Sequence, residues 1–470
     1  MTLIIPGVEV KVVKDVLTPQ LAPSGVLGLV AVTELQPPGG VGRADSWNSF
    51  ADSFGAASAF SAPEATQALA NGVFELVVCA VDPTTTTAAS IDIPVDTGTG
   101  KAFTLKARAG GPWANGLVVT LSPRAIQTTK ADGSADTPLK VFDLTVQRPG
   151  GSDVETFRNL SMDAADPRYV GTVLSLQSQI VIATDIDKKK PPKASDDKAP
   201  YKLAGGVDAG RADYQKALGK LVNESDVDMV LVSVQDLGNL TRLSQIYADM
   251  VAHCERMSTR SQGRIGFAGV PGSTEADIRS NGATLVNNLV SDRLMLVAPF
   301  NTVGAVAGMV GSLDYFQSPT FKRLALGGVS PALGVEAQQE LLQQNVVPVV
   351  AQRGRGVIVV RGLTSDGDQV SVRRVADRAV RGVKNIGEQF IGRLNNELGR
   401  GALKQNLIGF LVQMEKDGAI VPSTDGKDPA FKVNVYSSQA DFAQGIVRVD
   451  MAVRPVRAID YIYATVLVQV

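Results

Sequence analysis

The sequence contains a single histidine, His253, which limits the acid–base and metal chemistry of the chain. His253 lies in an apolar pattern of helical spacing, so we expect an ordinary histidine on the surface of a helix or partly buried in it. A Ser-His-Asp hydrolase would have to use this residue, and no G-x-S-x-G nucleophile turn accompanies it. A zinc site needs more His and Cys than the chain can gather in one place. We therefore expect no catalytic residue and no bound metal.

The glycine-rich segments do not have the spacing of phosphate or cation sites. GFAGVPGST (266–274) lies between an expected strand and an expected helix, but it lacks the lysine and the glycine spacing of a phosphate-binding loop. DGD (366–368) is expected to be a turn, not a calcium loop. Cys79 and Cys254 are expected to be two buried free thiols of a protein in a reducing compartment. We expect no cofactor.

One run of charged residues departs from the charge balance of the chain. Residues 371–405 hold eight Lys and Arg against three Asp and Glu, whereas the whole chain has a formal net charge of −1. Such a run is either a solvated helix face or a basic surface that docks on an acidic partner. The residues of the candidate basic face are Arg373, Arg374, Arg378, Arg381, Lys384 and Arg393.

Both ends of the chain have the pattern of extended apolar segments, although chain ends are usually polar and frayed. Residues 447–454 alternate apolar and polar side chains, Pro455 interrupts the pattern, and 459–470 is expected to form a second strand. Residues 1–13 are also apolar. Because exposed terminal strands pair with other chains, we expect strand exchange between neighbouring copies. The residues expected to pack between subunits are Ile4, Ile5, Val8, Val10, Ile459, Tyr461, Ile462, Tyr463, Val466 and Val468.

The composition is that of a large globular protein, with 470 residues, 44% of them hydrophobic and 20% charged. The balanced charge does not favour nucleic acid or a membrane as a partner, and the start of the chain lacks a signal-peptide pattern. Leu294–Leu313 has no charged residue and is long enough to span a bilayer. Its proline, polar residues and three glycines favour a buried strand followed by a glycine-rich helix.

The pattern of elements predicts a multidomain protein of the α/β and α+β classes. Apolar strands alternate with amphipathic helices in the centre of the chain, which is typical of a three-layer unit with a parallel sheet. Before them, short strands separated by turns predict an inserted antiparallel sandwich. The expected parts are an arm with the first strand (1–35), the start of the core (36–90), the outer sandwich (91–200), the α/β core (201–345) and a C-terminal α+β domain (346–470).

The C-terminal domain is expected to contain two amphipathic helices. An apolar stripe over 372–398 predicts one long helix that Gly399 or Gly401 ends. A second stripe, which begins at Leu403, predicts a helix that stops at Gly418.

Short motifs stand in a fixed order over most of the chain: IPGVEVKVV (5–13), AGGPWANGLVVTL (109–121), ETFRNLSMDAADPRYV (155–170), LAGGVDAG (203–210), SPTFK (318–322), VVRGLT (359–364) and VRPVRAIDYIYATV (453–466). They resemble segments of the contractile tail sheath proteins of phages and phage-tail-like injection machines. The first is similar to that family's PGVY-V arm, and the second to its G-x-W-G-N turn, with Ala114 where glycine is usual. The fourth is similar to the family's L-x-G-G-x-D-G segment, with Ala209 as an extra residue.

The resemblance implies a structural subunit and not an enzyme. It implies stacked six-fold rings around an inner tube, terminal arms inserted into neighbouring subunits, and a subtilisin-like α/β domain without a catalytic triad. The tube-facing part would be the C-terminal domain with its basic face. The implied partners are further copies of the chain, the tube protein, and baseplate and tail terminator proteins, without nucleic acid or membrane insertion. The implied location is a virion tail assembled in the bacterial cytoplasm, or a cytoplasmic contractile injection particle.

Two other classes of function stay open at this point. One is a hydrolase on the α/β domain, which would require a nucleophile beside His253. The other is a non-contractile filament or shell protein that uses the same strand exchange and has one lattice state. For a contractile sheath, we expect an extended lattice that stores energy at assembly and relaxes by rigid-body repacking, without a nucleotide.

Overall fold

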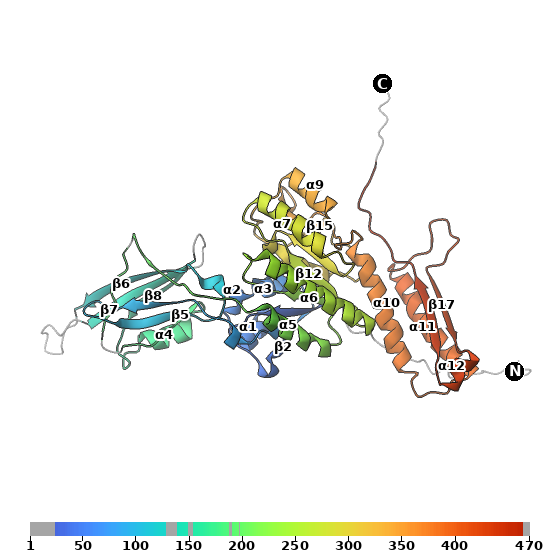
Figure 1. The fold of residues 1–470 in the computed structure, drawn as a ribbon, viewed down its shortest axis with the longest axis horizontal. Helices are drawn as coiled ribbons and strands as arrows, with labels where there is room; N and C mark the ends of the chain where they lie inside the picture. The colour runs from blue at the N-terminus through green and yellow to red at the C-terminus, as the bar shows by residue number, and fades with distance from the viewer. Residues whose placement is uncertain (1–23, 128–138, 149–153, 188–189, 197, 464–470) are drawn as a thin grey trace, which may run out of the picture. The chain divides into compact units, whose positions relative to one another are not determined.

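The computed structural model describes residues 24–127, 139–148, 154–187, 190–196 and 198–463. The chain divides into two compact units. The larger unit comprises Pro23–Arg374 together with the segment that begins at Ala458, and the smaller unit contains Val375–Arg457 (Figure 1).

A nine-stranded sheet forms the centre of the larger unit. Its six inner strands, from β15 to β3, are parallel, and antiparallel strands flank them at both edges. In spatial order the strands are β14 (Arg323–Leu324), β16 (Gly356–Val359), β15 (Val346–Gln352), β13 (Leu294–Ala298), β12 (Ile265–Gly269), β11 (Met229–Val232), β1 (Val26–Ala31), β3 (Glu75–Ala80) and β2 (Val41–Ala44). The inner strands are continuous apolar runs because both of their faces are buried.

Helices cover both faces of this sheet. On β1, Leu27 and Leu29 belong to one apolar core, whereas Val26 and Val30 belong to the other, as the alternation of side chains along a strand requires. The first core is covered by α1 (Trp47–Phe54), α3 (Pro63–Ala70) and α8 (Val303–Ser312). The second core is covered by α5 (Arg211–Lys220), α6 (Leu240–Thr259), α7 (Glu275–Asn288) and α9 (Val335–Gln343). This arrangement gives three layers, as the alternation of strands and helices predicts.

The uncharged stretch from Leu294 to Leu313 forms β13 followed by α8, as predicted from its glycines and proline. Its glycines allow α8 to lie close to α3: an added Cβ on Gly308 would lie 2.3 Å from the carbonyl oxygen of Ala68. Among the described residues, no helix is both long and apolar enough to cross a bilayer.

Two small antiparallel sheets form the region predicted as an outer sandwich. One contains β10 (Tyr201–Lys202), β6 (Val118–Ile126), β7 (Leu139–Gln147) and β8 (Val154–Leu160). The other contains β4 (Ser90–Pro94), β5 (Lys101–Ala107) and β9 (Val181–Thr184). Both sheets and α4 (Val170–Gln177) contribute to one apolar core, in which Phe103 and Phe142 stack with ring centroids 6.0 Å apart. The antiparallel strands expected here are therefore present.

The predicted long helix over 372–398 is wrong. Helix α10 (Val370–Glu388) ends earlier, and a non-helical stretch separates it from α11 (Glu397–Lys416), which contains both glycines that were expected to end the first helix. Gly392 adopts φ +82° in this stretch, and the Asn396 side chain caps α11 by accepting from the N–H of Gly399 at 2.8 Å. The end of α11 agrees with the sequence, because Gly418 follows it with φ +78°.

The rest of the smaller unit is a two-stranded antiparallel sheet with one short helix. Strands β17 (Phe431–Tyr436) and β18 (Arg448–Val453) pair along their whole length, and α12 (Gln439–Ala443) lies between them in sequence. One face of the sheet is apolar and packs on α11 through Leu403 and Leu407. The alternating strand predicted at 447–454 is confirmed as β18.

Candidate functional site

The predicted arm residues that the structure describes are exposed and apolar. Ile459, Tyr461, Ile462 and Tyr463 have exposed fractions of 79%, 63%, 84% and 94%. Residues 459–463 form no strand, which corrects the expectation of a strand from Ile459, because no partner strand lies beside them in the described part of this single chain. The other residues predicted to pack between subunits lie outside the described residues: Ile4, Ile5, Val8, Val10, Val466 and Val468.

The first residues of this arm are tied to the larger unit through Asp460. Its carboxylate accepts from Arg361 Nε at 2.9 Å and from Gln369 Nε2 at 2.9 Å, and its side chain is only 7% exposed. Thr320 Oγ1 lies 3.4 Å from the other carboxylate oxygen. Buried charge-assisted hydrogen bonds of this kind are short and directional. We call Asp460 and its three partners the arm root.

Gln369 also holds the backbone of the arm root. Its Nε2 donates to the carbonyl oxygen of Ala458 at 3.0 Å, and its Oε1 accepts from the N–H of Ala458 at 2.9 Å. The amide therefore satisfies both backbone groups of one residue, as a neighbouring strand would. Beyond Asp460, the guanidinium of Arg361 lies 5.2 Å from the ring centroid of Tyr461, a cation–π distance.

The fold brings the three partners of Asp460 together from separate elements. Thr320 lies in the loop before β14, Arg361 follows β16, and Gln369 immediately precedes α10. Thr320 Oγ1 accepts from the N–H of Gly362 at 3.2 Å, which fixes the loop against the end of β16. An isolated antiparallel bridge between Leu363 and Gln369 closes the turn that positions the amide. The arm therefore leaves the larger unit from a rigid base.

The β17–β18 pair is a candidate acceptor for strands of other chains. Within the described residues, each strand pairs only with the other, so both outer edges carry unpaired backbone groups. Lys432, Asn434 and Asp450 are exposed on the face that points away from α11. A two-stranded sheet gains stability when further strands are added to it.

The candidate basic face is smaller than the sequence indicates. Arg374 is 5% exposed and donates to the backbone carbonyls of Leu313 and Asp314, both at 3.3 Å, so it is not part of an exposed face. Arg373 pairs with Asp292 at 2.9 Å. Arg373 and Arg374 fit the helical spacing of the candidate basic face. The start of α10 nevertheless belongs to the core of the larger unit, and the charge pattern alone does not show that Arg374 is buried there.

The other four basic residues lie in the smaller unit. Arg378, Arg381 and Lys384 are half-buried along α10, and Lys384 lies 3.9 Å from Glu388. Arg393 is exposed beyond the end of α10, with its guanidinium 4.5 Å from the ring centroid of Phe390. These four residues are the part of the candidate basic face that keeps a surface position.

His253 is buried, which corrects the expectation of a surface or partly buried residue. It is 1% exposed, and Arg264 Nη1 lies 2.7 Å from its Nε2 while Arg256 Nη2 lies 3.4 Å from its Nδ1. Burial and the two guanidinium groups lower the pKa of His253 to about 3, so the ring is neutral at physiological pH. Arginine, and not a nucleophile, lies beside each ring nitrogen.

The two cysteines are buried free thiols, as predicted. Burial raises the pKa of Cys79 to about 12, which makes its thiol unreactive. Within the described ranges, no group of three or more His, Cys, Asp and Glu side chains is placed to hold a metal ion. The GFAGVPGST segment is a strand-to-helix turn in which Thr274 caps α7 by accepting from the N–H of Asp277 at 3.2 Å.

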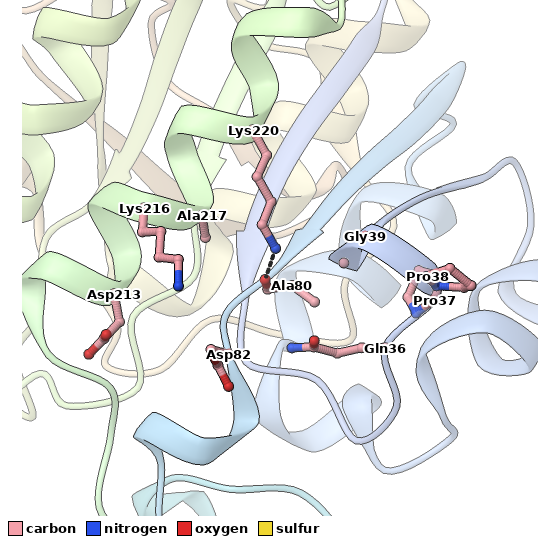
Figure 2. Close-up of a pocket in the computed structure, with 11 residues that line it drawn as sticks. Gln36, Pro37, Pro38, Gly39, Ala80, Asp82, Asp213, Lys216, Ala217 and Lys220 are labelled. Carbon is pink, nitrogen blue, oxygen red and sulfur yellow. Dashed lines mark hydrogen bonds between the residues drawn. The ribbon is translucent and has the colours of Figure 1, made fainter.

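A pocket of about 460 Å³ lies beside the carboxyl end of β3 (Figure 2). It is lined by the loop that begins at Gln36 and by residues of α5, including Asp213, Lys216 and Lys220. Lys220 Nζ donates to the carbonyl oxygen of Ala80 at 3.2 Å, and Asp82, two residues after Ala80, also lines the pocket. The lining residues include no serine, cysteine or histidine, so the pocket offers charge of both signs but no nucleophile with a base.

Comparison with known proteins identifies the family. Residues 208–365 match the family model of the phage tail sheath protein central domain, and residues 364–469 match the phage tail sheath C-terminal domain. Together the two matches cover more than half of the sequence. The chain belongs to the contractile tail sheath protein family. A search of curated proteins gave no match.

Solved structures with the same fold are distant in sequence. The crystal structure of a sheath tail protein from Listeria innocua aligns with a TM-score of 0.50 and 15% identity, covering 94% of each chain. The helical sheath of the anti-feeding prophage in its contracted state aligns with a TM-score of 0.53 and 13% identity, covering 98% of this chain and 99% of that one. The sheath complex of the extracellular contractile injection system PVC, also contracted, aligns with a TM-score of 0.54 and 11% identity, covering 99% and 98%.

Proposed function

We propose that this chain polymerises as stacked six-fold rings around an inner tube, and that the polymer contracts by rigid-body rearrangement to drive the tube through a target envelope. Family membership supports a sheath role. The observation that carries the proposal within this chain is the exposed apolar arm that leaves a buried, hydrogen-bonded root at Asp460. Such a segment is unfavourable in water and gains stability when a neighbour covers it.

In this proposal the arm of one subunit adds a strand to the β17–β18 pair of the next. Strand addition satisfies the unpaired backbone groups at the edge of the pair and buries apolar arm side chains. If about six side chains are buried at roughly 1.5–3 kcal/mol each, an arm contributes on the order of 10 kcal/mol before the entropy of ordering is subtracted. The contact is head-to-tail, and contacts of this type generate rings or helical arrays.

The tube-facing surface of the proposal consists of Arg378, Arg381, Lys384 and Arg393. Contacts between this basic face and an acidic tube surface would be lost on contraction, while contacts between sheath subunits grow. The arms keep neighbouring subunits joined while the units rotate, and the extended state is held kinetically. No nucleotide is required, because the energy is stored during assembly.

The partners and the location in this proposal are those that membership of the tail sheath family implies. The partners are further copies, a tube protein, and baseplate and tail terminator proteins, and the particle is a phage tail or an injection particle assembled in the bacterial cytoplasm. The subtilisin-like assignment of the nine-stranded sheet and the non-enzymatic role stay predictions. A non-contractile filament with the same strand exchange is the competing proposal, and it predicts one lattice state.

Deletion of the arm tests this function. The full chain and a chain that ends at Ala458 are purified and concentrated, with and without a candidate tube protein, and imaged by negative-stain electron microscopy. The full chain is expected to form striated tubes, and the truncated chain is expected to stay folded and unassembled. Ordered tubes from the truncated chain would exclude strand exchange by the arm, and one unchanging tube diameter under all conditions would favour the non-contractile filament.

A further inference from the structure

A cluster of cations occupies one edge of the nine-stranded sheet. Lys322 and Arg323 belong to the β14 segment, and Arg353 and Arg355 belong to the turn between β15 and β16. All four side chains are exposed, and none forms an ion pair or a side-chain hydrogen bond with a residue of the described ranges. Like charges that lie close together repel one another, and a negative surface docked on them offsets this repulsion. We call these four residues the basic corner.

An exposed aromatic residue lies within the basic corner. Phe321 is 52% exposed, and the guanidinium of Arg355 lies 5.4 Å from its ring centroid. The backbone of Phe321 has φ +57°, which is strained for a bulky side chain, and its N–H donates to the carbonyl oxygen of Val359 at 2.8 Å. A strained residue that presents an aromatic ring beside arginine has the composition of a protein–protein contact.

Carboxylates gather at the opposite edge of the same sheet. Arg43 on β2 lies 2.6 Å from Glu75, 2.6 Å from Glu224 and 2.7 Å from Asp226. One guanidinium is thus shared by three carboxylates at this surface. Asp45, directly after β2, is exposed and adds to it. We call Glu75, Glu224, Asp226 and Asp45 the acidic corner.

The two corners lie diagonally across one sheet. The basic corner is at the β14 and β16 edge, and the acidic corner is at the β2 edge. Glu75 begins β3 and Asp226 precedes β11, so the acidic corner lies at the amino ends of the parallel strands, whereas Arg353 follows the carboxyl end of β15. Figure 1 shows β15 at the upper side and β2 at the lower side of the α/β part of the larger unit. Surfaces that are complementary and far apart on one body cannot satisfy each other within a single chain.

We propose that the basic corner of one copy docks on the acidic corner of the next copy, which gives the sheath a second contact that is independent of strand exchange. The proposal rests on the proposed function, since the occupant is a second copy of this chain. Charge complementarity selects that occupant. Continuity supports it as well: Thr320, which contacts Asp460 in the arm root, directly precedes Phe321, so the basic corner lies beside the root of the arm that is proposed to enter another copy.

The contact joins two different surfaces, so it repeats in one direction and does not close as a two-fold dimer. Because the corners are diagonal, each step displaces the next copy both across the strands and along them. Charge pairs at a partly solvated surface weaken as salt is added, so this contact is expected to depend strongly on ionic strength.

Two charge-reversal variants test the proposal. The first, Arg353→Glu with Arg355→Glu, leaves two cations and two carboxylates in the basic corner and so removes its net positive charge, and the second, Glu224→Lys with Asp226→Lys, makes both corners basic. A matched control, Lys106→Glu with Lys140→Glu, makes the same charge change on two exposed lysines of the sandwich sheets. Polymer is measured by sedimentation and negative-stain microscopy, and circular dichroism checks that each chain is folded.

Each reversal variant alone is expected to lose at least tenfold in sedimenting polymer, and the control is expected to polymerise as the wild type does. An equimolar mixture of the two variants is expected to form a one-to-one complex, through the unchanged acidic corner of the first variant and the unchanged basic corner of the second. Wild-type polymerisation by the Arg353/Arg355 variant alone would overturn the proposal, and this would also be the result if the basic corner bound nucleic acid instead. A mixture that stays monomeric would overturn it too.

The result separates this proposal from the proposed function. If the wild-type chain forms no polymer, the sheath proposal is in doubt, and complex formation between the two variants is then measured at low salt by analytical ultracentrifugation. If the two variants form no mixed complex, corner docking is overturned. If they do form one, corner docking is supported even though the chain forms no tubes. If the Glu224/Asp226 variant fails to fold beside Arg43, the Arg353/Arg355 variant still decides, since its side chains have no ion-pair partner within the described ranges.

Discussion

The side-chain amide of Gln369 forms with Ala458 both of the hydrogen bonds that a paired strand would form, at 3.0 and 2.9 Å. The same amide nitrogen also donates to Asp460 at 2.9 Å. Gln369 is 7% exposed and directly precedes α10, so the direction in which the arm leaves is set by a rigid part of the fold. The exposed residues that follow therefore begin at a defined position, and this lowers the entropic cost of the proposed strand exchange.

Loss of this amide should loosen the arm without unfolding the chain. Replacing Gln369 with Ala removes three hydrogen bonds and leaves Asp460 paired with Arg361, so we expect a cost on the order of 1–3 kcal/mol at the arm root. Hydrogen exchange should show faster exchange at Ala458 and unchanged protection in β1. Replacement of Gln389, an exposed glutamine after α10, serves as the control. Unchanged exchange at Ala458 would show that Gln369 does not hold the root.

The buried carboxyl of Glu64 predicts a pH dependence of stability. Glu64 is 3% exposed and accepts from Ser233 Oγ at 2.6 Å, and burial raises its pKa above the ordinary value of 4.5. A raised folded-state pKa means that the stability contributed by the neutral acid is fully present below pH 4.5 and is lost as the pH rises through the folded-state pKa.

Glu64→Gln should therefore raise Tm at neutral pH, and its advantage over the wild type should shrink as the pH falls toward 4.5. Thermal melts of both chains between pH 4 and pH 8 measure this difference. Glu255→Gln, on an exposed position of α6, should produce no such trend. A constant difference at every pH would contradict a neutral, buried Glu64.

Much of the fold could be predicted from the sequence because most inner strands of the large sheet are continuous apolar runs. The apolar runs of β1, β11, β12 and β13 are long enough to identify without a structure, and the glycines of α8 favour a closely packed helix. Strand β15 was not predicted because Pro348 interrupts an apolar run that is only seven residues long. The break after α10 was also missed, because the apolar stripe continues through 389–396 without a helical backbone.

The candidate site could be predicted only in part. Exposed apolar residues at the end of the chain indicate an interaction segment, and this is visible in the sequence. Its root is not, because Thr320, Arg361 and Gln369 lie 140, 99 and 91 residues from Asp460 along the chain, and only the fold brings them together. Burial of Arg374 likewise depends on tertiary contacts, whereas helical spacing placed it with the surface arginines.

The contact between α8 and α3 predicts a strong effect at one glycine. Gly308→Ala places a methyl group 2.3 Å from the carbonyl oxygen of Ala68, so the helices must separate, at a cost of about 1–3 kcal/mol. Gly219→Ala on α5 is the matched control: apart from the adjoining residues and the backbone of α5 itself, no atom lies within 4 Å of the added Cβ, and alanine there should stabilise by about 0.5–1 kcal/mol. Urea unfolding of both variants measures whether each substitution raises or lowers the free energy of unfolding. A Gly308→Ala variant with unchanged stability would contradict the close packing.

The central claim, that the arm of one copy enters the β17–β18 pair of another, is tested most directly by cross-linking. A chain that carries Ile462→Cys with Ala452→Cys, and a second with Ile462→Cys and Lys432→Cys, are assembled and treated with a short bifunctional maleimide. Native Cys79 and Cys254 are buried and stay unmodified. In the control chains, Leu176→Cys, at a similarly exposed position of α4, takes the place of Ile462→Cys.

Strand exchange predicts a ladder of covalent oligomers from at least one of the two arm pairings, in assembled tubes only, and no ladder from the control. Tubes that form normally and give no ladder with either pairing would contradict strand exchange into the β17–β18 pair.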